Sequence, residues 1–151
     1  MLCYGGCQEQ DIDLQAFYNR GDLNMNLEKV IFAFFIVLAL TLNFGFFIGD
    51  LDDPAHHNIY ELFAALVVSL IATIMKFGDR AHIGAVLLAT SLVADLQLVA
   101  AAVVWTITVH ATDTGMTPMV MASIVSLSGG ALLANITSVI ILVTETVMFR
   151  R

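Results

Sequence analysis

The chain has 151 residues, of which 59% are hydrophobic and only 13% charged, and its formal net charge is −7. Soluble domains contain roughly 45–50% apolar and about 25% charged residues, so this composition argues against a soluble globular domain. The acidic balance leaves no basic patch to neutralise phosphates, which argues against nucleic acid as a partner. The length predicts a single domain with no separate soluble module.

Residues 1–24 are polar and acidic and show no apolar periodicity. They lack the basic n-region and apolar h-region of a secretory signal peptide. The segment is predicted to be a flexible cytoplasmic tail. An alternative is that Met25 is the native start, in which case the tail has no function.

Four long apolar segments follow, at about residues 30–49, 59–77, 82–109 and 118–149. A membrane-spanning helix needs about 20 residues to cross about 30 Å of hydrocarbon. The first two segments fit this length, and the longer third and fourth are expected to tilt or project beyond the bilayer. Because the connections are short, consecutive helices are expected to be antiparallel neighbours. The sequence therefore predicts an all-α polytopic membrane protein, a four-transmembrane-helix antiparallel bundle formed by residues 25–151.

The basic residues predict the orientation of this bundle. All six Lys and Arg residues precede the first segment, flank the second connection or end the chain. The positive-inside rule assigns that side to the cytoplasm, so both termini are expected there. The bias is complete, which argues against a dual-topology protein that forms inverted dimers.

Asp95 lies near the middle of the third segment. A charged side chain at the bilayer centre costs roughly 2.5–3.5 kcal/mol, so it must face a partner or a cavity, or be protonated. One interpretation is a carboxylate that binds a proton or cation. The other is a neutral Asp that is hydrogen-bonded to a neighbouring helix and holds the bundle together.

Polar residues of the other segments fall at a similar depth in the membrane. The resulting predicted layer consists of Asn43, Ser69, Ser91, Asp95 and Asn135. Amide and hydroxyl oxygens beside one carboxylate suit H⁺, Na⁺ or K⁺ better than a transition metal. The layer is therefore a hypothetical ion-binding site.

Small residues recur every four positions along the fourth segment. This stripe comprises Ala122, Ser126, Gly130, Ala134 and Ser138, and the first segment has a shorter version in Gly45 and Gly49. Small residues let helix backbones approach closely in lipid, so both stripes are predicted to be packing surfaces. Whether they pack within one bundle or between subunits stays open.

The first connection is acidic and contains two adjacent histidines. Its candidate residues are Asp50, Asp52, Asp53, His56, His57 and Glu61. They could concentrate cations at a channel mouth, bind a divalent metal or sense external pH. The favoured interpretation is a solvated loop in which Asp53 and Glu61 cap helices, and the Asn58–Glu61 spacing resembles a capping box.

Catalytic motifs are missing from the sequence. HExxH, GxSxG and Walker patterns do not occur, and the chain has no Cys–His pair within its apolar segments. We therefore expect neither an enzyme nor a protein with a cofactor or a dedicated metal site.

The stretches NFGFFIGDLDDPAHHNIYELFAA, KFGDRAHIGAVLLATSLVADLQLVAAA and VMASIVSLSGGALLAN resemble a family of small, functionally uncharacterised bacterial integral membrane proteins with four helices. The resemblance covers about residues 25–149. It implies a location in the bacterial inner membrane and carries no activity with it.

Two functional hypotheses follow. The first is an oligomeric channel or transporter for a proton or monovalent cation that uses Asp95. The second is a non-catalytic accessory or structural subunit of a larger membrane complex. Four helices are few for a complete pathway, so both hypotheses require association, either as a homo-oligomer or with a partner membrane subunit.

Overall fold

A computed structural model describes residues 27–51, 53–77, 82–113 and 115–148. The predicted tail, residues 1–24, lies outside the described residues. The chain divides into two units, Met1–Phe32 and Ala33–Arg151. The first unit contributes only the opening turns of a helix to the described structure, and the following paragraphs concern the second.

All regular structure in the described residues is helical. The first helix is Leu27–Phe47, followed by the short 3-10 helix η1 (Pro54–His56) and by the helices α2 (Ile59–Lys76), α3 (His82–Ala111) and α4 (Pro118–Met148). Each of the four long helices is apolar and long enough to cross a membrane. The predicted all-α, four-helix membrane fold is confirmed.

Local chemistry explains where these helices begin. The Asn58 side chain accepts a hydrogen bond from the Tyr60 N–H at 3.0 Å and so caps the first turn of α2. Thr117 does the same for α4, because its hydroxyl accepts from the Val120 N–H at 3.3 Å. Pro118 follows it at the first helical position, where the missing N–H has no consequence.

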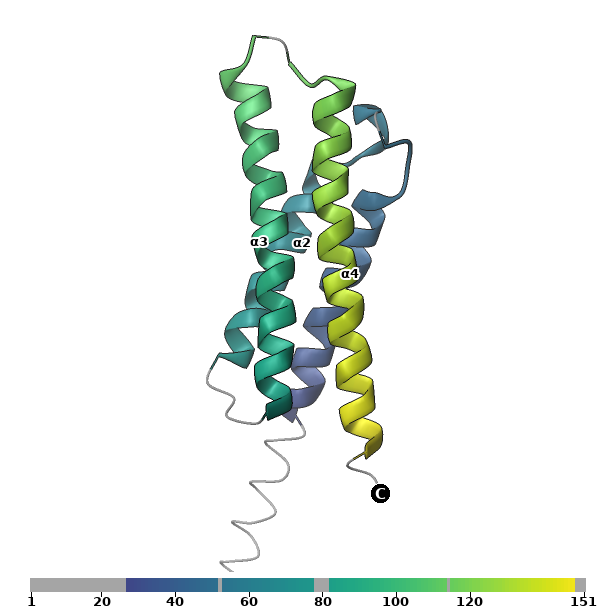
Figure 1. Cartoon of the computed structure of the whole chain (residues 1–151), viewed down its shortest axis with the longest axis vertical. Helices are drawn as coiled ribbons and strands as arrows, with labels where there is room; N and C mark the ends of the chain where they lie inside the picture. Colours follow the sequence, from purple (N-terminus) through teal and green to yellow (C-terminus); the bar gives the residue numbers. More distant parts are fainter. Residues whose placement is uncertain (1–26, 52, 78–81, 114, 149–151) are drawn as a thin grey trace, which may run out of the picture. The chain divides into compact units, whose positions relative to one another are not determined.

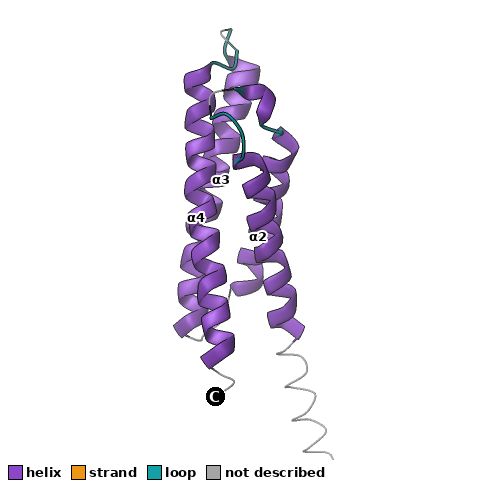
Figure 2. Cartoon of the chain, turned by 90° about the vertical axis from the view of Figure 1, so that its right-hand side faces the viewer, coloured by secondary structure: helices purple, strands orange, loops and turns teal. Residues whose placement is uncertain are grey.

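In the second unit, α3 packs along both α2 and α4 (Figure 1). The view turned by 90° shows α2, α3 and α4 running alongside one another as parts of one bundle (Figure 2). The first helix meets α2 where the Glu61 carboxylate lies against Gly45, and it meets α4 where the Phe47 ring lies against Gly129. The connections before α2 and after α3 lie at the same end of the bundle, which we call the α3–α4 end. The α2–α3 end is the opposite one.

The bundle has an apolar exterior and a partly polar interior. Leu96 is 71% exposed, whereas its neighbour Asp95 is only 5% exposed. Soluble proteins bury apolar side chains and hydrate charged ones, so this reversal is the arrangement expected of helices surrounded by lipid.

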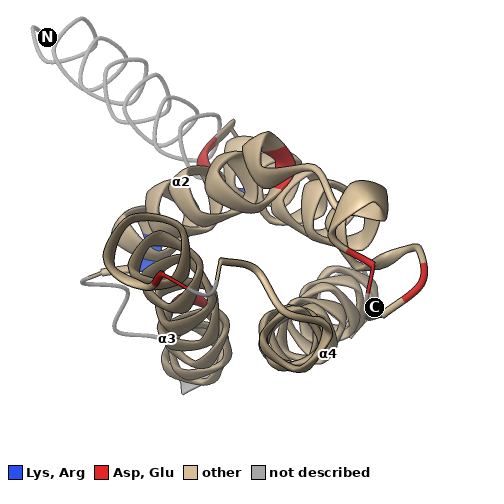
Figure 3. Cartoon of the chain, turned by 90° about the horizontal axis from the view of Figure 1, so that it is seen from above, with Lys and Arg blue, Asp and Glu red and all other residues tan. Residues whose placement is uncertain are grey.

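The interior is also divided along its length. The largest cluster of buried apolar residues is concentrated toward the α3–α4 end, where Phe46, Leu62, Met121, Ile124 and Val125 pack together. Seen from this end, acidic positions mark the connections at the rim (Figure 3). Other buried polar side chains, among them Thr73 and Asp95, lie further down.

Candidate functional site

Asp95 is held by a residue of the neighbouring helix. The Thr73 hydroxyl of α2 donates a hydrogen bond of 2.6 Å to Asp95 Oδ2, and both side chains are buried. The other carboxylate oxygen, Oδ1, is buried and has no hydrogen-bond partner in the described part of the chain. Half of the carboxylate therefore remains available to bind a ligand.

Two interhelical contacts show at which level along the bundle the neighbouring polar groups lie relative to Asp95. Thr73 aligns α2 with Asp95, and a 2.6 Å hydrogen bond between Thr90 and Ser138 aligns α3 with α4. At 1.5 Å per residue, Ser69 lies about 6 Å from the level of Asp95 on one side and Ser91 about 6 Å on the other.

Asn135 on α4 completes the set of buried polar residues. It precedes Ser138 by three residues, so it lies about 4.5 Å from the Thr90 level, between Ser91 and Asp95. Ser69, Ser91 and Asn135 are fully buried. We call these residues the Asp95 cluster, defined as Ser69, Thr73, Ser91, Asp95 and Asn135.

The cluster contains several buried polar atoms that lack a partner among the described residues. These atoms are Ser69 Oγ, Ser91 Oγ, Asp95 Oδ1, Asn135 Oδ1 and Asn135 Nδ2. An unpaired buried polar group costs about 1–3 kcal/mol, and native proteins contain few of them. They come from three helices and lie within about 6 Å of the Asp95 level along the bundle, so they are candidate ligands for an ion or for water.

Asn43 is buried, and its amide is hydrogen-bonded to α4. Its Nδ2 donates to the Ser128 carbonyl at 3.0 Å, and its Oδ1 accepts from the Ser128 hydroxyl at 2.6 Å. Asn43 therefore links the first helix to α4 and offers no free group to an ion. Of the five residues in the predicted layer, the structure buries all, and the other four belong to the Asp95 cluster.

Thr73 and Gln97 were not foreseen from the sequence. Thr73 could have been found, because it follows Ser69 by one turn on the same face of α2. Lys76 continues that face and is also buried. Gln97 has a buried, unpartnered Oε1 and packs so closely on Gly130 that a Cβ there would meet this oxygen at 2.6 Å. No sequence signal indicated this contact.

The candidate ligand atoms of the Asp95 cluster are oxygens, because the Asn135 amide nitrogen is a hydrogen-bond donor and does not coordinate a cation. One carboxylate with neutral oxygens suits a proton or a monovalent cation such as Na⁺ or K⁺, because divalent ions need more oxygen ligands and more negative charge. No group of three His, Cys, Asp or Glu residues in the described ranges lies close enough to hold a metal ion.

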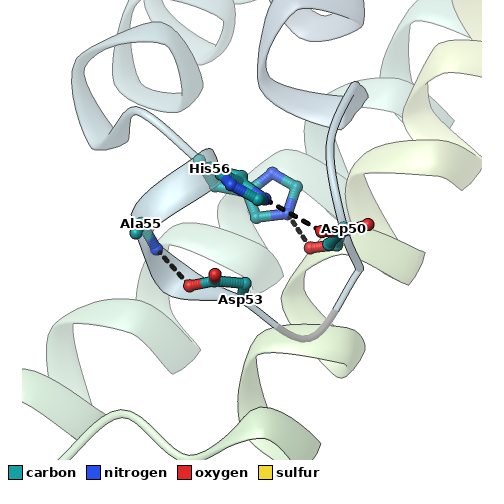
Figure 4. A network of polar contacts seen from close by, with 5 residues as sticks. Asp50, Asp53, Ala55 and His56 are labelled. Carbon is teal, nitrogen blue, oxygen red and sulfur yellow. Dashed lines mark hydrogen bonds and ion pairs between the residues drawn. The ribbon is translucent and has the colours of Figure 1, made fainter.

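The acidic residues of the first connection are used in local contacts (Figure 4). Asp53 accepts from the Ala55 N–H at 2.9 Å and caps η1, and Asp50 Oδ2 lies 3.3 Å from His56 Nδ1. The Glu61 carboxylate lies over Gly45 of the first helix. Asp52 is outside the described residues.

The two histidines of the predicted outer cluster differ in their environment. The His56 side chain is 49% exposed, whereas His57 is 5% exposed. His57 Nδ1 lies 2.6 Å from the Phe46 carbonyl oxygen and Nε2 lies 2.9 Å from the Asp50 carbonyl oxygen. His57 is therefore not part of a solvated mouth, because the folding of the loop places its ring between backbone carbonyls.

The structure places the members of the predicted small-residue stripes in different environments, and packing between subunits stays a prediction. On α4, Gly130 and Ser138 contact α3, but Ser126 is exposed, because a four-residue repeat drifts around a helix with 3.6 residues per turn. Ala122 and Ala134 are half-buried. Gly49 lies beyond the end of the first helix and has φ +137°, so it is a turn residue.

Four apolar helices of membrane-spanning length, three of which contribute buried polar groups to the Asp95 cluster, define a small multi-pass membrane protein. The chain belongs to a family of unknown function (DUF6394), whose sequence pattern matches residues 56–146. The matched region includes α2, α3 and α4 and therefore the whole Asp95 cluster. The expected membership of a functionally uncharacterised family is confirmed. No curated protein and no solved structure matches the chain.

Proposed function

We propose that the Asp95 cluster binds a proton or a monovalent cation, and that the protein conducts or couples the movement of this ion across the membrane. The observation that supports the proposal is the set of unpartnered buried polar atoms around Asp95. A carboxylate that only held helices together would be expected to use both of its oxygens. Here one oxygen is bonded to Thr73 and the other faces no donor among the described residues.

The energetics favour an occupied site. A charged residue at mid-membrane costs roughly 2.5–3.5 kcal/mol, and each unpaired polar group adds about 1–3 kcal/mol. A proton or a cation with its waters neutralises the carboxylate and supplies partners for the serine and asparagine side chains. Binding therefore removes several of these penalties together.

We further propose the biological setting in which this function operates. The placement of all six basic residues favours cytoplasmic N- and C-termini, and the sequence resemblance favours a bacterial inner membrane. Four helices are few for a complete ion pathway within one chain, so we favour a homo-oligomer as the functional unit. No catalytic chemistry is proposed.

Reconstituted vesicles provide the test. Asp95→Asn keeps the size of the side chain and removes its charge, and the loss of a charge-assisted contact of about 1.5–3 kcal/mol predicts a ten- to hundredfold lower flux, roughly. Asp113→Asn is the matched control, because it makes the same chemical change at an exposed position of the α3–α4 connection. Equal flux in wild type and both variants removes the proposal.

The same vesicles distinguish the ions. A pH gradient, a Na⁺ gradient and a K⁺ gradient are imposed separately, and flux is followed with dyes for each ion. Asn135→Ala and Ser91→Ala remove neutral candidate ligands that lie within about 6 Å of the Asp95 level. Cation binding predicts a loss of discrimination between Na⁺ and K⁺ in these variants, whereas proton binding predicts unchanged selectivity for H⁺.

A second candidate function is an accessory subunit of a larger membrane complex. It is favoured by an open groove of about 390 Å³ between α3 and α4, lined by residues that include Ala89, Thr90, Val93, Gly130, Ala134 and Thr137. Small side chains allow a helix of another protein to approach closely. Purification from native membranes in mild detergent tests this candidate, which requires a larger partner in fixed stoichiometry.

A further inference from the structure

The loop between the first helix and α2 contains a buried imidazole with unusual hydrogen-bond partners. His57 is 5% exposed, and both of its ring nitrogens lie within 3 Å of backbone carbonyl oxygens, at 2.6 Å from Phe46 and 2.9 Å from Asp50. A carbonyl oxygen can only accept a hydrogen bond. Both nitrogens must therefore carry a proton if both contacts are hydrogen bonds.

A neutral imidazole cannot meet this requirement. It has one N–H donor and one lone pair, and only the protonated ring donates from both nitrogens. The Phe46 carbonyl is one of the last four of the first helix, which lack partners within the helix. A positive charge at this position is further favoured by the negative end of the helix dipole.

The charged groups near His57 also favour a positive ring. On the loop, Asp50 and Asp53 are acidic, and the titratable His56 contacts Asp50. From α2, the Glu61 carboxylate reaches the first helix at Gly45.

From the other helices, the groups packed near the His57 ring carry no charge. The ring centroid of His57 lies 5.3 Å from that of Phe46, and Phe46 lies 6.4 Å from Trp105 of α3. The buried residues of α4 that share this core are Met121, Ile124 and Val125. No described basic side chain competes with the protonated imidazole in this core.

We propose that His57 is a proton-dependent latch that fastens the connection before α2 to the end of the first helix. The protonated ring bridges the Phe46 and Asp50 carbonyls. When the ring loses a proton, one nitrogen presents a lone pair to a carbonyl oxygen less than 3 Å away, so one bridge is lost and replaced by repulsion. The loop then separates from the helix end or rearranges.

The direction of the pH dependence follows from this geometry. The latched state binds the additional proton, so acid favours it and alkali releases it.

Gly49 allows the latch to form. Its φ of +137° turns the chain back after the first helix, and a Cβ at this position would meet the His56 Cβ at 2.9 Å and the His57 Cε1 at 3.5 Å. A side chain at position 49 would therefore push the loop away from the helix end.

The row of contacting rings beside the latch provides a natural fluorescent reporter. Trp105 is the only tryptophan in the sequence, and it contacts the Phe46 ring, which in turn contacts His57. Release of the latch therefore changes the environment of a single fluorophore. This reporter is independent of ion flux, so it tests the latch whether or not Asp95 binds an ion.

The experiment records Trp105 emission of the full chain in lipid nanodiscs from about pH 5 to pH 8. We expect one titration in wild type and in His56→Gln and His110→Gln, and none in His57→Gln, whose amide donates hydrogen bonds but does not titrate. A wild-type signal that does not change with pH, or a titration that persists in His57→Gln, overturns the proposal.

A second measurement needs no variant that has to fold. Nitrogen-15 NMR of histidine-labelled wild type distinguishes protonated from unprotonated ring nitrogens. At about pH 5 the buried ring is expected to show two protonated nitrogens, with both N–H protons shielded from exchange with solvent. A buried neutral ring at this pH contradicts the latch.

Discussion

The contact between Asn43 and Ser128 makes a quantitative prediction about helix association. Asn43→Ala removes two interhelical hydrogen bonds, of 3.0 and 2.6 Å, whereas Ser128→Ala removes only the second. Such bonds contribute about 0.6 kcal/mol each on average in membrane proteins and at most about 1.7 kcal/mol. The expected losses of stability are therefore about 1.2–3.4 kcal/mol for Asn43→Ala and about 0.6–1.7 kcal/mol for Ser128→Ala.

The double variant carries the decisive information. Once Asn43 is alanine, the Ser128 hydroxyl has already lost its partner, so its removal should cost little more. The coupling energy is expected to be about 0.6–1.7 kcal/mol, measured by a double-mutant cycle on unfolding in a detergent mixture. Thr41→Val and Ser123→Ala form the control pair, because each hydroxyl bonds only to a carbonyl of its own helix. Additive losses for Asn43 and Ser128, within about 0.5 kcal/mol, would refute the contact.

Further predictions concern glycines and helix caps, and all are measured as the free energy of unfolding in the same detergent mixture. Gly49→Ala should cost about 1–3 kcal/mol, because its positive φ is strained for alanine and the added Cβ meets the His56 Cβ. Gly45→Ala should cost less, since its Cβ meets only the movable end of the Glu61 side chain. Equal losses in the two variants would contradict this distinction. Gly130→Ala should likewise cost less than Gly49→Ala, because the added Cβ meets only the movable end of the Gln97 side chain, and Ser126→Ala at an exposed position should change little. Asn58→Ala should cost about 1 kcal/mol through loss of the α2 cap, and an unchanged stability would show that water replaces the cap.

The depth of polar residues was predictable from the sequence for a simple physical reason. Membrane helices rise by 1.5 Å per residue and must match the bilayer, so counting from each boundary places a residue along the membrane normal. Asp95 and Asn135 were assigned to one depth in this way, and the contacts of Thr73 and Ser138 agree with that assignment. Ion binding by these residues stays a prediction.

The rotation of each helix about its axis was not predictable. Hydropathy hardly differs between the faces of helices that are apolar all round, so the sequence did not show that Asn43 faces Ser128 or that Gln97 faces Gly130. Similarly, two adjacent histidines look alike in a sequence. Only the path of the loop after Gly49 determines that His57 is buried while its neighbour is exposed.

The division of the bundle interior has an electrical consequence. Toward the α3–α4 end, the interior is dominated by the packed apolar cluster around Phe46, Met121 and Val125, and the hydrogen-bonded pair of Asn43 and Ser128 lies beside it. The buried side chains of Thr73, Asp95, Lys76 and Ser138 lie nearer the α2–α3 end. A transmembrane voltage falls mainly across insulating regions, and moving one charge through 100 mV requires about 2.3 kcal/mol. We therefore expect Asp95 to be electrically closer to the solution at the α2–α3 end than to the solution at the α3–α4 end.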